Sequence, residues 1–586
     1  MSPTCKSIIT PYKEMCGSIS LISEVLCPEM QPKTLKIVLY TLFFLFPTLY
    51  HSLPLSTNSR WIIEEPSGNR KKLTCVNWAA HLQPMLPEGI EKKPLKYIAE
   101  QVGAMGFNCV RLTWATYMFT RFSNRTVAES LDQLGLKQAM VGMTQYNPLF
   151  LNLTLVDAQK AVVDELGAHN IMVVLDNHVS LPKWCCSEND GNGFFGDLYF
   201  DSNEWLLGLT MVANRYKGNP AIVAMSLRNE LRGPHQNETG WYKYIQEGAT
   251  AIHSENPDVL VVVSGLSFET NLSFLKEKPL ELNFSNKLVY EAHWYGFFNP
   301  KQKWLSETLE IDEKTNEECA NVTEEFIKQS AFVMMSSTSR SSNNPAPLFL
   351  SEFGVDQRGV NEGDNRYLGC LLSIMAERDI DWALWALQGS YMLREGQVDS
   401  EEVYGMFDVN WDHLRNSTVQ QRLQLIKQMT QGELQNQMTE NISFIMYHPQ
   451  SGQCVQAAKD SFFTSDCQDW SFWAHHEDGG PIRLTDSSGC LTAVADGVPA
   501  IISDDCSSQK SMWKLVSSSK LHVAAQDELG RTEIIWEGPL WSRRKTQSIA
   551  VRQIDFGPGG SSGPCSIFTS VEYTKLKATD LDESGA

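Results

Sequence analysis

The sequence predicts an α/β chain: a (β/α)8 TIM barrel followed by an all-β β-trefoil domain. Between residues 60 and 430, strand-like apolar runs alternate with amphipathic segments of helix length. Eight strands that alternate with helices over about 350 residues are typical of this barrel. From about residue 441 the helical periodicity fades, and short apolar runs separated by Gly, Ser and Asp indicate the second domain.

The predicted barrel elements are apolar runs for the strands and one-sided apolar patterns for the helices. The strands are expected at 73–77, 108–112, 171–175, 222–227, 259–263, 287–290, 348–351 and 382–386, and three of the helices at 94–105, 156–169 and 240–256. A doubly wound open sheet is the competing architecture, and it needs a Gly-rich phosphate turn after the first strand. Residues 76–79 (Val-Asn-Trp-Ala) contain no such turn, so the barrel is favoured.

Residues 1–59 are predicted to be an upstream extension followed by a secretory leader. The apolar run 35–50 follows Lys33 and precedes a small-residue segment, as in a signal peptide. This run is shorter than the about 20 apolar residues of a spanning helix and contains Pro47, so no stable membrane span is expected. Met30 directly precedes the basic start and is the expected initiation site. An N-terminal anchor of a type II membrane protein remains the alternative.

Glycosylation sequons and cysteines support export. Asn-x-Ser/Thr occurs at Asn124, Asn152, Asn237, Asn271, Asn283, Asn321, Asn416 and Asn441. Of the 14 cysteines, eleven follow the predicted leader, and this odd number leaves at least one free thiol. We therefore expect a secreted glycoprotein in an oxidising compartment such as the cell wall.

The charge balance excludes one class of partner. The chain has 49 Lys and Arg against 69 Asp and Glu, a net charge of −20. Binding to a nucleic-acid backbone needs clustered basic residues, so no nucleic-acid partner is expected. The 16 Trp, 17 Tyr and 26 Phe suit a carbohydrate-binding surface as well as a core.

The C-terminal segment 441–570 contains an internal repeat of about 40 residues. Its first copy has Ser451-Gly452-Gln453-Cys454, Cys467 and Trp473, its second has Ser488-Gly489-Cys490, Cys506 and Trp513, and a third without cysteines runs from Leu521 to Trp536. Three such units would close into a β-trefoil. Residues 431–440 are the expected linker, and residues 571–586 are an expected flexible tail.

This repeat resembles the ricin B-type lectin family, whose repeats pair two cysteines and end in Gln-x-Trp. The resemblance implies the disulfides Cys454–Cys467 and Cys490–Cys506. Both tryptophans lack the preceding Gln, so we expect Trp473 and Trp513 to be core residues. Whether this domain makes a second glycan contact stays open.

Polar side chains follow six of the predicted barrel strands, at the ends where a parallel barrel carries its catalytic groups. They are Arg111 after the second strand, Asp176-Asn177-His178 after the third, Arg228-Asn229-Glu230 after the fourth, Glu291 to Tyr295 after the sixth, Glu352 after the seventh and Trp385 after the eighth. Single polar residues are common where strands reach water. Recurrence at six strand ends predicts one site at one mouth of the barrel.

Glu230 and Glu352 are the two carboxylates expected to carry the chemistry. Glycosidic cleavage needs one carboxyl group that protonates the leaving oxygen and a second that acts at the anomeric carbon. A separation of about 5–5.5 Å makes the second group a nucleophile, whereas about 6.5–9.5 Å leaves room for a water and gives inversion. From spacing alone, both outcomes stay open.

The complete set resembles glycoside hydrolase family 5, the cellulase family. The matching residues, in order over residues 61–430, are Arg111, His178, Asn229, Glu230, His293, Tyr295, Glu352 and Trp385. The resemblance implies a retaining mechanism with Glu230 as acid/base and Glu352 as nucleophile. It also implies that Asn229 binds the 2-hydroxyl of the reactive sugar.

The resemblance implies supporting roles for the other matching residues. Tyr295 would orient the nucleophile, and Arg111 would lower its pKa. His178 and His293 would line the same subsite, and Trp385 would stack on the sugar ring.

Several neighbouring residues have alternative interpretations. Trp382 is the alternative stacking residue, and Trp78 and His81 are candidates for a more distant sugar subsite. Glu269 and Glu291 are rim carboxylates outside the pattern, expected behind the site or at the surface.

No metal ion or cofactor is expected. Asp190, Asn192 and Asp197 in the loop 184–197 suggest calcium, but no glutamate closes that loop at the twelfth position, so a substrate-flanking loop is favoured. His475-His476 lacks a third ligand for zinc. The neighbouring Cys185 and Cys186 are expected to be structural.

The sequence therefore predicts a secreted retaining glycosidase that acts on a β-linked polysaccharide, a glucan or a mannan. One alternative is a hydrolase of β-glucosyl lipids. Another is a catalytically weak, lectin-like carbohydrate-binding protein.

Overall fold

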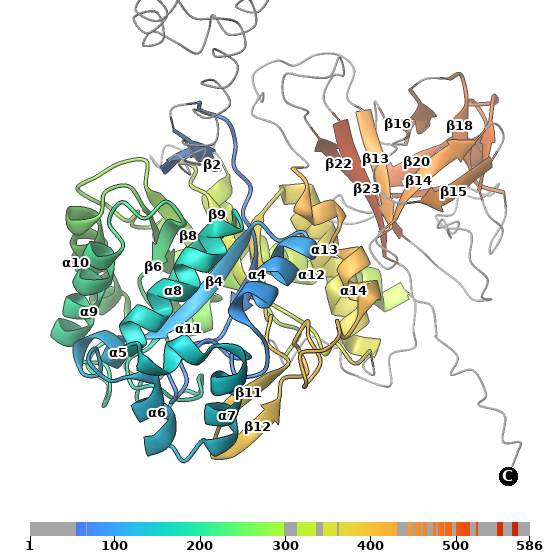
Figure 1. Cartoon of the computed structure of the whole chain (residues 1–586). Helices are drawn as coiled ribbons and strands as arrows, with labels where there is room; N and C mark the ends of the chain where they lie inside the picture. Colours follow the sequence, from blue (N-terminus) through green and yellow to red (C-terminus); the bar gives the residue numbers. More distant parts are fainter. Residues whose placement is uncertain are drawn as a thin grey trace, which may run out of the picture. The chain divides into compact units, whose positions relative to one another are not determined.

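The computed structural model describes residues 54–65, 67–297, 313–335, 344–359 and 362–429, and shorter stretches between residues 443 and 571 (Figure 1). Residues 1–53 of the predicted leader, the predicted linker 431–440 and residues 572–586 of the predicted tail lie outside the described residues. Within the described ranges, no helix has the length and apolar character needed to cross a membrane.

Eight parallel strands close into a barrel in the order β10-β3-β4-β5-β6-β7-β8-β9. Their bounds are β3 Thr74–Trp78, β4 Cys109–Ala115, β5 Met172–Val179, β6 Ile222–Ser226, β7 Leu260–Ser264, β8 Leu288–His293, β9 Leu348–Phe353 and β10 Asp381–Leu384. Each strand coincides with one of the eight apolar runs predicted to be strands. The predicted (β/α)8 barrel is confirmed.

Six strands extend beyond their predicted carboxyl ends, and in β5, β8 and β9 this places polar residues inside the strands. His178, His293 and Glu352 belong to β5, β8 and β9 rather than to the segments after them, and Arg111 lies within β4. The reason is that these side chains pair with one another inside the barrel, as Arg111 does with Glu352 at 2.8 Å. Buried polar side chains with partners let a strand continue where an apolar pattern has already ended.

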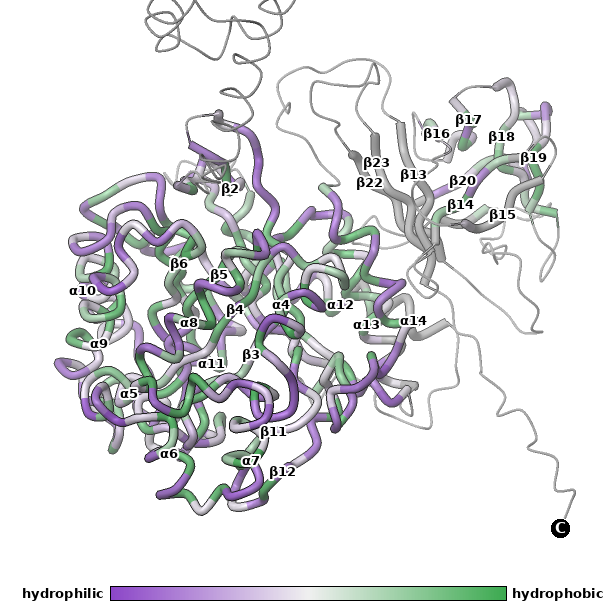
Figure 2. The backbone as a smooth tube through the Cα atoms, viewed as in Figure 1, coloured by the Kyte–Doolittle hydropathy of each residue, from purple (hydrophilic) through white to green (hydrophobic). Residues whose placement is uncertain are grey.

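Helices surround the barrel and bury one face each. They are α4 Leu95–Ala104, α5 Thr116–Thr120, α6 Val127–Gln133, α7 Lys137–Tyr146, α8 Leu155–Ala168, α9 Ser202–Arg215, α10 Glu238–Glu255, α11 Leu266–Glu269, α12 Glu313–Gln329, α13 Glu362–Arg378 and α14 Ser417–Arg422. Figure 2 shows hydrophilic and hydrophobic residues mixed along the outer helices, as expected for elements with one buried face. The three helices predicted by range correspond to α4, α8 and α10.

Two tryptophans attach helices to strand ends that lead into the site. The indole of Trp205 on α9 donates to the carbonyl of Leu227 at 2.9 Å, just after β6. Trp241 on α10 donates to the carbonyl of Ser264 at 2.9 Å, at the end of β7. Both indoles are fully buried, so each bond satisfies a donor and also fixes the start of the loop that follows the strand.

The amino end of the barrel is closed by apolar packing and a disulfide. Cys75 on β3 and Cys109 on β4 form a disulfide between neighbouring strands. A short antiparallel hairpin, β1 (Leu55–Asn58) and β2 (Trp61–Glu64), precedes β3. The predicted boundary between leader and barrel at residue 59 falls inside this hairpin.

A second hairpin follows β10 at the catalytic end. It consists of β11 (Ser390–Arg394) and β12 (Gln397–Glu401), paired antiparallel. Three residues on and just after this hairpin line a cavity at this end of the barrel: Arg394, Glu402 and Tyr404.

The described C-terminal strands form one sheet in the order β19-β18-β17-β16-β13-β23-β22-β21-β20, with β14 and β15 paired beside β13. Their bounds are β13 Ser443–His448, β14 Gln453–Ala458, β15 Ser461–Ser465, β16 Trp473–Ala474, β17 Arg483–Leu484, β18 Cys490–Thr492, β19 Ile501–Ser503, β20 Trp513–Leu515, β21 Val523–Ala525, β22 Ser548–Ile554 and β23 Cys565–Val571. The described part of this segment is therefore built mainly of β-strands. The described strands do not establish a three-fold repeat, so the trefoil stays a prediction.

Two expectations within the repeat can be compared with the structure. Trp473 and Trp513 are fully buried in one apolar cluster, as expected of core residues. Cys490 and Cys506 form the implied disulfide. Cys467 and the start of the third copy lie outside the described residues.

Candidate active site

All eight residues of the predicted site gather at the carboxyl end of the barrel strands. Six of them line a cavity of about 700 Å³: His178, Asn229, Glu230, Tyr295, Glu352 and Trp385. Arg111 and His293 lie behind this lining, almost completely buried. This volume is within the range of about 300–1,000 Å³ that is typical of cavities that bind organic ligands.

The two predicted catalytic carboxylates face each other in this cavity. Glu230 lies in the segment that follows β6, and Glu352 lies on β9. Their side chains keep small exposed fractions of 9% and 7%. One oxygen of Glu230 and one of Glu352 lie within 4.8 Å of each other. The strands place both groups at one mouth of the barrel, as the sequence predicts.

Arg111 lies in the centre of the barrel and connects the nucleophile candidate to its neighbours. Its guanidinium donates to Glu352 at 2.8 Å, to Asn77 at 3.0 Å and to Asn229 at 2.9 Å. A further ion pair joins it to Asp176 at 3.0 Å. Because a guanidinium donates in a fixed plane, Arg111 determines the orientation of both Glu352 and Asn229.

Glu352 also accepts a hydrogen bond from the hydroxyl of Tyr295 at 3.0 Å. Burial raises the pKa of Glu352 to about 7, although the His293 imidazolium and the Arg111 guanidinium pull it down. From the sequence, Arg111 is expected to lower this pKa. Arg111 acts in that direction, but the desolvation of a buried carboxylate outweighs it.

His293 lies between the two catalytic carboxylates. Its Nδ1 is 2.9 Å from Glu230 and 3.7 Å from Glu352, and its Nε2 is 3.0 Å from Glu269. Burial opposes the charge, but Glu269 and Glu352 outweigh it and raise the pKa of His293 well above its ordinary value. His293 is therefore a buried imidazolium that contacts three carboxylates.

Glu269 was expected behind the site or at the surface, and it lies behind the site. It is completely buried, and its carboxylate accepts a hydrogen bond from the backbone N–H of Glu230 at 2.6 Å while it pairs with His293. It thus contacts both the backbone of one catalytic residue and the imidazolium beside the other. The only sequence signal is its place a few residues after the fifth predicted strand.

The backbone that carries these groups is strained. Glu230 has φ of 46°, and Ser267, Phe268 and Glu269 have φ of 55°, 59° and 62°. Non-glycine residues rarely adopt this left-handed region, and such strain clusters at functional sites. The turn at 267–269 directs the Glu269 carboxylate into the site.

Glu291 was also expected behind the site or at the surface, and it lies completely buried behind Arg111. The hydroxyl of Ser226 donates to it, and Arg111 is 3.7 Å away. Burial raises the pKa of Glu291 to about 8, and repulsion from Glu269 acts in the same direction.

One wall of the cavity is a row of flat rings. His81 and His178 stack with centroids 3.9 Å apart, and His178 and Trp385 stack at 5.8 Å. Burial and the nearby Arg111 hold the pKa of His178 well below its ordinary value, and its Nδ1 contacts Asp176 at 2.6 Å. His178 is therefore a neutral ring.

The other aromatic candidates lie in the core. Trp382 is fully buried, packs against Phe107 and Phe353, and donates to the carbonyl of Ile426. Trp78 is fully buried and donates to the carbonyl of Glu88. Neither indole can stack on a sugar.

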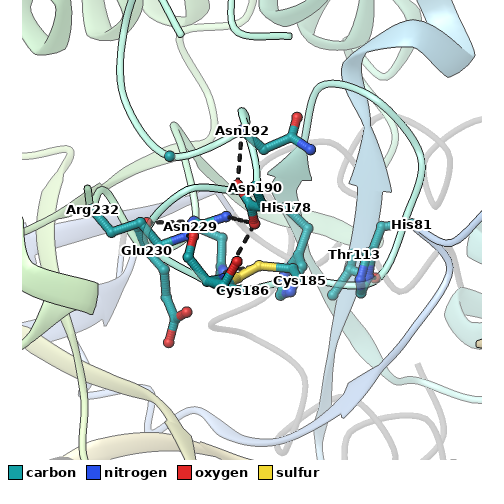
Figure 3. The surroundings of a disulfide bond; sticks show 12 residues. His81, Thr113, His178, Cys185, Cys186, Asp190, Asn192, Asn229, Glu230 and Arg232 are labelled. Atoms are coloured by element: carbon teal, nitrogen blue, oxygen red, sulfur yellow. Dashed lines mark hydrogen bonds and ion pairs between the residues drawn. A yellow bond between two sulfur atoms is a disulfide. The ribbon is translucent and has the colours of Figure 1, made fainter. Parts of the chain in front are cut away.

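The loop 184–197 borders the site, and its oxygen atoms already have protein partners. Asp190 pairs with Arg232 at 2.5 Å, Asn192 accepts from the backbone of Ser180 at 3.0 Å, and Asp197 accepts from Phe194 at 2.8 Å. These oxygens act as turn and loop anchors rather than as a calcium set. Figure 3 shows the disulfide between Cys185 and Cys186 in this loop, and both cysteines line the cavity.

Two groups of side chains among the described residues have the spacing of metal ligands. One contains His178, Cys185 and Cys186, and the other Glu230, His293 and Glu352. The sulfurs of the first group are joined in a disulfide and are not thiolates, which is the form that binds a metal. A protonated His293 has no lone pair to offer in the second. The donor chemistry fits neither group to a metal ion.

Comparisons with known proteins identify the family of the chain. A family model described as "Cellulase (glycosyl hydrolase family 5)" matches residues 71–390. A glycosyl hydrolase 5 family protein from Chamaecyparis obtusa is 43% identical over 507 residues, which cover 84% of this chain and 88% of the relative. An endoglucanase from Paenibacillus polymyxa is 22% identical over 371 residues, covering 58% of this chain and 84% of that protein.

Solved structures share the barrel. The catalytic domain of the major endoglucanase from Xanthomonas campestris pv. campestris matches with a TM-score of 0.50 and 21% identity, over 64% of this chain and 98% of that domain. An endocellulase from Pyrococcus horikoshii in complex with cellotetraose matches with a TM-score of 0.51 and 17% identity, over 65% of this chain and 100% of that one. These two matches show the fold. The family model and the relative at 43% identity show that the chain belongs to glycosyl hydrolase family 5, the cellulase family, and is a glycosidase.

Proposed function

We propose that this protein is a retaining endo-β-glucanase that cleaves a β-linked glucan by double displacement. The observation that carries the proposal is the separation of the two carboxylates, whose nearest oxygens lie within 4.8 Å. A pair about 5–5.5 Å apart suits a covalent intermediate, whereas an inverting pair is about 6.5–9.5 Å apart to hold a water.

In the first step, an ionised Glu352 attacks the anomeric carbon while the bond to the leaving oxygen breaks. Glu230 gives its proton to that oxygen, so the aglycone leaves as an alcohol and Glu352 becomes a glycosyl ester. Tyr295 and Arg111, bonded to different oxygens of Glu352, hold the attacking carboxylate in place.

In the second step, the ionised Glu230 takes a proton from a water that attacks the anomeric carbon. The ester bond to Glu352 breaks, the sugar leaves with its original configuration, and both carboxyl groups return to their starting states. The imidazolium of His293 contacts both groups, so it stabilises whichever carboxylate is charged at each step.

The cavity lining supports a glycan as substrate. The lining contains aromatic rings with flat apolar faces and side chains with polar groups. The rings are Trp184, Tyr295, Phe297, Trp385 and Tyr404, and the polar groups belong to Asn229, Arg394 and Glu402. Sugar rings combine apolar faces with hydroxyl edges, which such a lining can bind. A β-glucan is the preferred substrate class because a relative is named endoglucanase and a matching structure contains cellotetraose.

The test is the configuration of the first product. Proton NMR during hydrolysis of a soluble β-glucan should show the β-anomer first, with the α-anomer appearing only as mutarotation proceeds. Initial release of the α-anomer would show inversion and contradict double displacement. Turnover of β-glucosyl lipids but of no β-glucan would instead support the glycolipid alternative, and binding without any product would support the lectin-like one.

We also propose that the protein is exported and glycosylated. The disulfides Cys75–Cys109 and Cys319–Cys370 support an oxidising compartment. Several sequon asparagines in the described ranges are exposed, which glycosylation requires: Asn124, Asn152, Asn237, Asn283 and Asn321. Secretion from a eukaryotic host should yield a shortened, endoglycosidase-sensitive chain, and a full-length cytosolic product would contradict export.

A second glycan contact through residues 441–570 is kept as a proposal. Trp473 and Trp513 are buried, so other residues must make this contact. Retention of the Glu352→Gln variant on insoluble β-glucan in the presence of excess cellotetraose would support it. Complete release by cellotetraose would contradict it.

A further inference from the structure

We propose that the Cys185–Cys186 disulfide is an apolar contact surface for a pyranose ring beside Glu230, and that it contributes to the affinity for the glycan. This inference rests on the proposed function, because it assigns one wall of the same site. Nothing in the catalytic steps above uses these two sulfurs.

The position of the disulfide supports a direct contact with substrate. Both cysteines line the catalytic cavity, together with His178, Asn229 and Glu230. In Figure 3 the sulfurs lie between Asn229 and Glu230 on one side and His178 and His81 on the other. Cys185 is 7% exposed, and Cys186 is half-buried. The bridge therefore lies within the same cavity wall as Glu230, where a bound sugar can contact it.

The sulfurs also contact the residue expected to bind the reactive sugar. The Nδ2 of Asn229 is 3.6 Å from the sulfur of Cys186 and 3.9 Å from that of Cys185. Its Oδ1 accepts from Arg111 at 2.9 Å, which fixes the direction of the amide. Because sulfur is a weak acceptor, the amide N–H groups remain available for a stronger acceptor such as a sugar hydroxyl.

The loop that carries the disulfide is fixed to the catalytic strand end. Arg232 donates to the carbonyl of Ser187 at 3.0 Å, to the carboxylate of Asp190 at 2.5 Å and to the carbonyl of Glu230 at 2.6 Å. One guanidinium thus joins the segment that follows the bridge to the acid/base residue. Because this wall is already ordered, little conformational entropy is lost there when a sugar binds.

The base of the bridge is apolar. Cys185 packs against Ala115 and Val179 at the ends of β4 and β5. Two joined sulfurs form a polarizable surface without a strong donor or acceptor, and such a surface suits the C–H face of a sugar ring. Two separate thiols or hydroxyls would be polar donors at the same place, and a sugar would have to displace water from them.

The test compares two variants that each remove one disulfide. Cys185→Ser/Cys186→Ser removes the bridge and makes its surface polar. The control, Cys490→Ser/Cys506→Ser, removes a disulfide whose residues do not line the cavity. Both pairs are made in the Glu352→Gln background, and the Kd for cellotetraose is measured by calorimetry. Hydrolysis of soluble β-glucan is measured in the background that keeps Glu352.

We expect the Kd to rise about tenfold for Cys185→Ser/Cys186→Ser, which is the effect of losing about two buried methylene equivalents of contact. The control should change the Kd less than about twofold. Circular dichroism and the melting temperature establish that the first variant is folded. Cys185→Ala/Cys186→Ala, apolar but unbridged, should lie between the parent and the serine variant.

Other outcomes overturn the inference in different ways. If the parent hydrolyses β-glucan and the folded serine variant binds cellotetraose as tightly as the parent, the contact surface is wrong and the proposed function stands. If the parent neither binds nor hydrolyses β-glucan, the proposed function fails and this inference fails with it. If the unreduced, denatured parent is alkylated at Cys185 and Cys186, the bridge itself is absent.

Discussion

The two ends of the barrel each bury a cluster of charged side chains, and the clusters differ in their balance. At the amino end, Arg70 and Lys72 both pair with Asp379, and Asp381 accepts from the backbone N–H of Leu73 at 2.7 Å. At the catalytic end, two cations face five acids: Arg111 and His293 against Asp176, Glu230, Glu269, Glu291 and Glu352.

The difference separates a cluster that stabilises the fold from one that is suited to the proposed chemistry. In the balanced cluster, paired charges connect the segment before β3 to β10 and close the barrel. In the other, burial raises the pKa values of Glu352 to about 7 and of Glu291 to about 8, and repulsion from neighbouring carboxylates acts in the same direction. Groups poised to exchange protons near neutral pH are typical of catalytic sites. The following variants test this comparison.

Glu352→Gln should have the largest effect on rate. Without the nucleophile no glycosyl ester forms, and kcat should fall by roughly 10⁵-fold or more, as when a covalent catalyst is removed from other hydrolases. Because the variant removes a buried negative charge from an acid-rich cluster, its melting temperature should not fall. Activity within tenfold of the parent would contradict the assignment.

Asp379→Asn should have the largest effect on stability. It leaves Arg70 and Lys72 buried without their shared carboxylate, and breaking a buried ion pair costs about 3–5 kcal/mol of unfolding free energy. Asn tolerates the left-handed φ of 50° at this position, so the backbone is not the cause. Urea denaturation measures the loss. Folded Asp379→Asn protein should keep kcat within about threefold, and a catalytic defect in the folded variant would break the comparison.

Glu269→Gln tests the positioning role that the structure assigns to this buried acid. The variant removes the negative charge that raises the pKa of His293, so the histidine should titrate at lower pH when followed by NMR. We expect kcat to fall roughly tenfold to a hundredfold, because the imidazolium between Glu230 and Glu352 is less stable.

Glu291→Gln is the matched control, since Glu291 is equally buried but contacts Ser226 and Arg111. It should leave the titration of His293 closer to the parent than Glu269→Gln does. Equal shifts in the two variants would remove the special role of Glu269.

Arg111→Gln should have the smallest effect of these variants, a shift of the pH profile in one direction. Arg111 lowers the pKa of Glu352, so its loss raises that pKa further above its ordinary value. The nucleophile must be ionised, and activity is lost as the pH falls through its pKa. The acidic limb of kcat/KM should therefore move to higher pH, by about one unit or more. Arg111→Lys keeps the charge and should move it less, whereas a shift to lower pH would contradict the account.

The sequence predicted the barrel well because its strands are buried on both faces and read as apolar runs. It predicted their carboxyl ends poorly, because β5 and β9 continue through His178 and Glu352 as paired polar residues. The hairpin β1–β2 was missed because the Ser- and Thr-containing run 55–58 was assigned to the leader.

In the site, too, some features could be predicted from the sequence and others could not. The eight residues at strand ends could be predicted because barrel topology alone brings strand ends together. Glu269 could not, because its direction depends on three successive left-handed residues without glycine, for which the sequence carries no signal. The choice between Trp382 and Trp385 needed the structure, since only packing shows which indole faces the core.

The most direct test of the catalytic pair is to trap the covalent intermediate. A 2-deoxy-2-fluoro-β-glucoside or cellobioside with a good leaving group should inactivate the enzyme by slowing the second step. Proteolysis and mass spectrometry should then find one fluoroglycosyl group on Glu352. A label on any other carboxylate, or unlabelled enzyme that turns the compound over with inversion, would contradict the account.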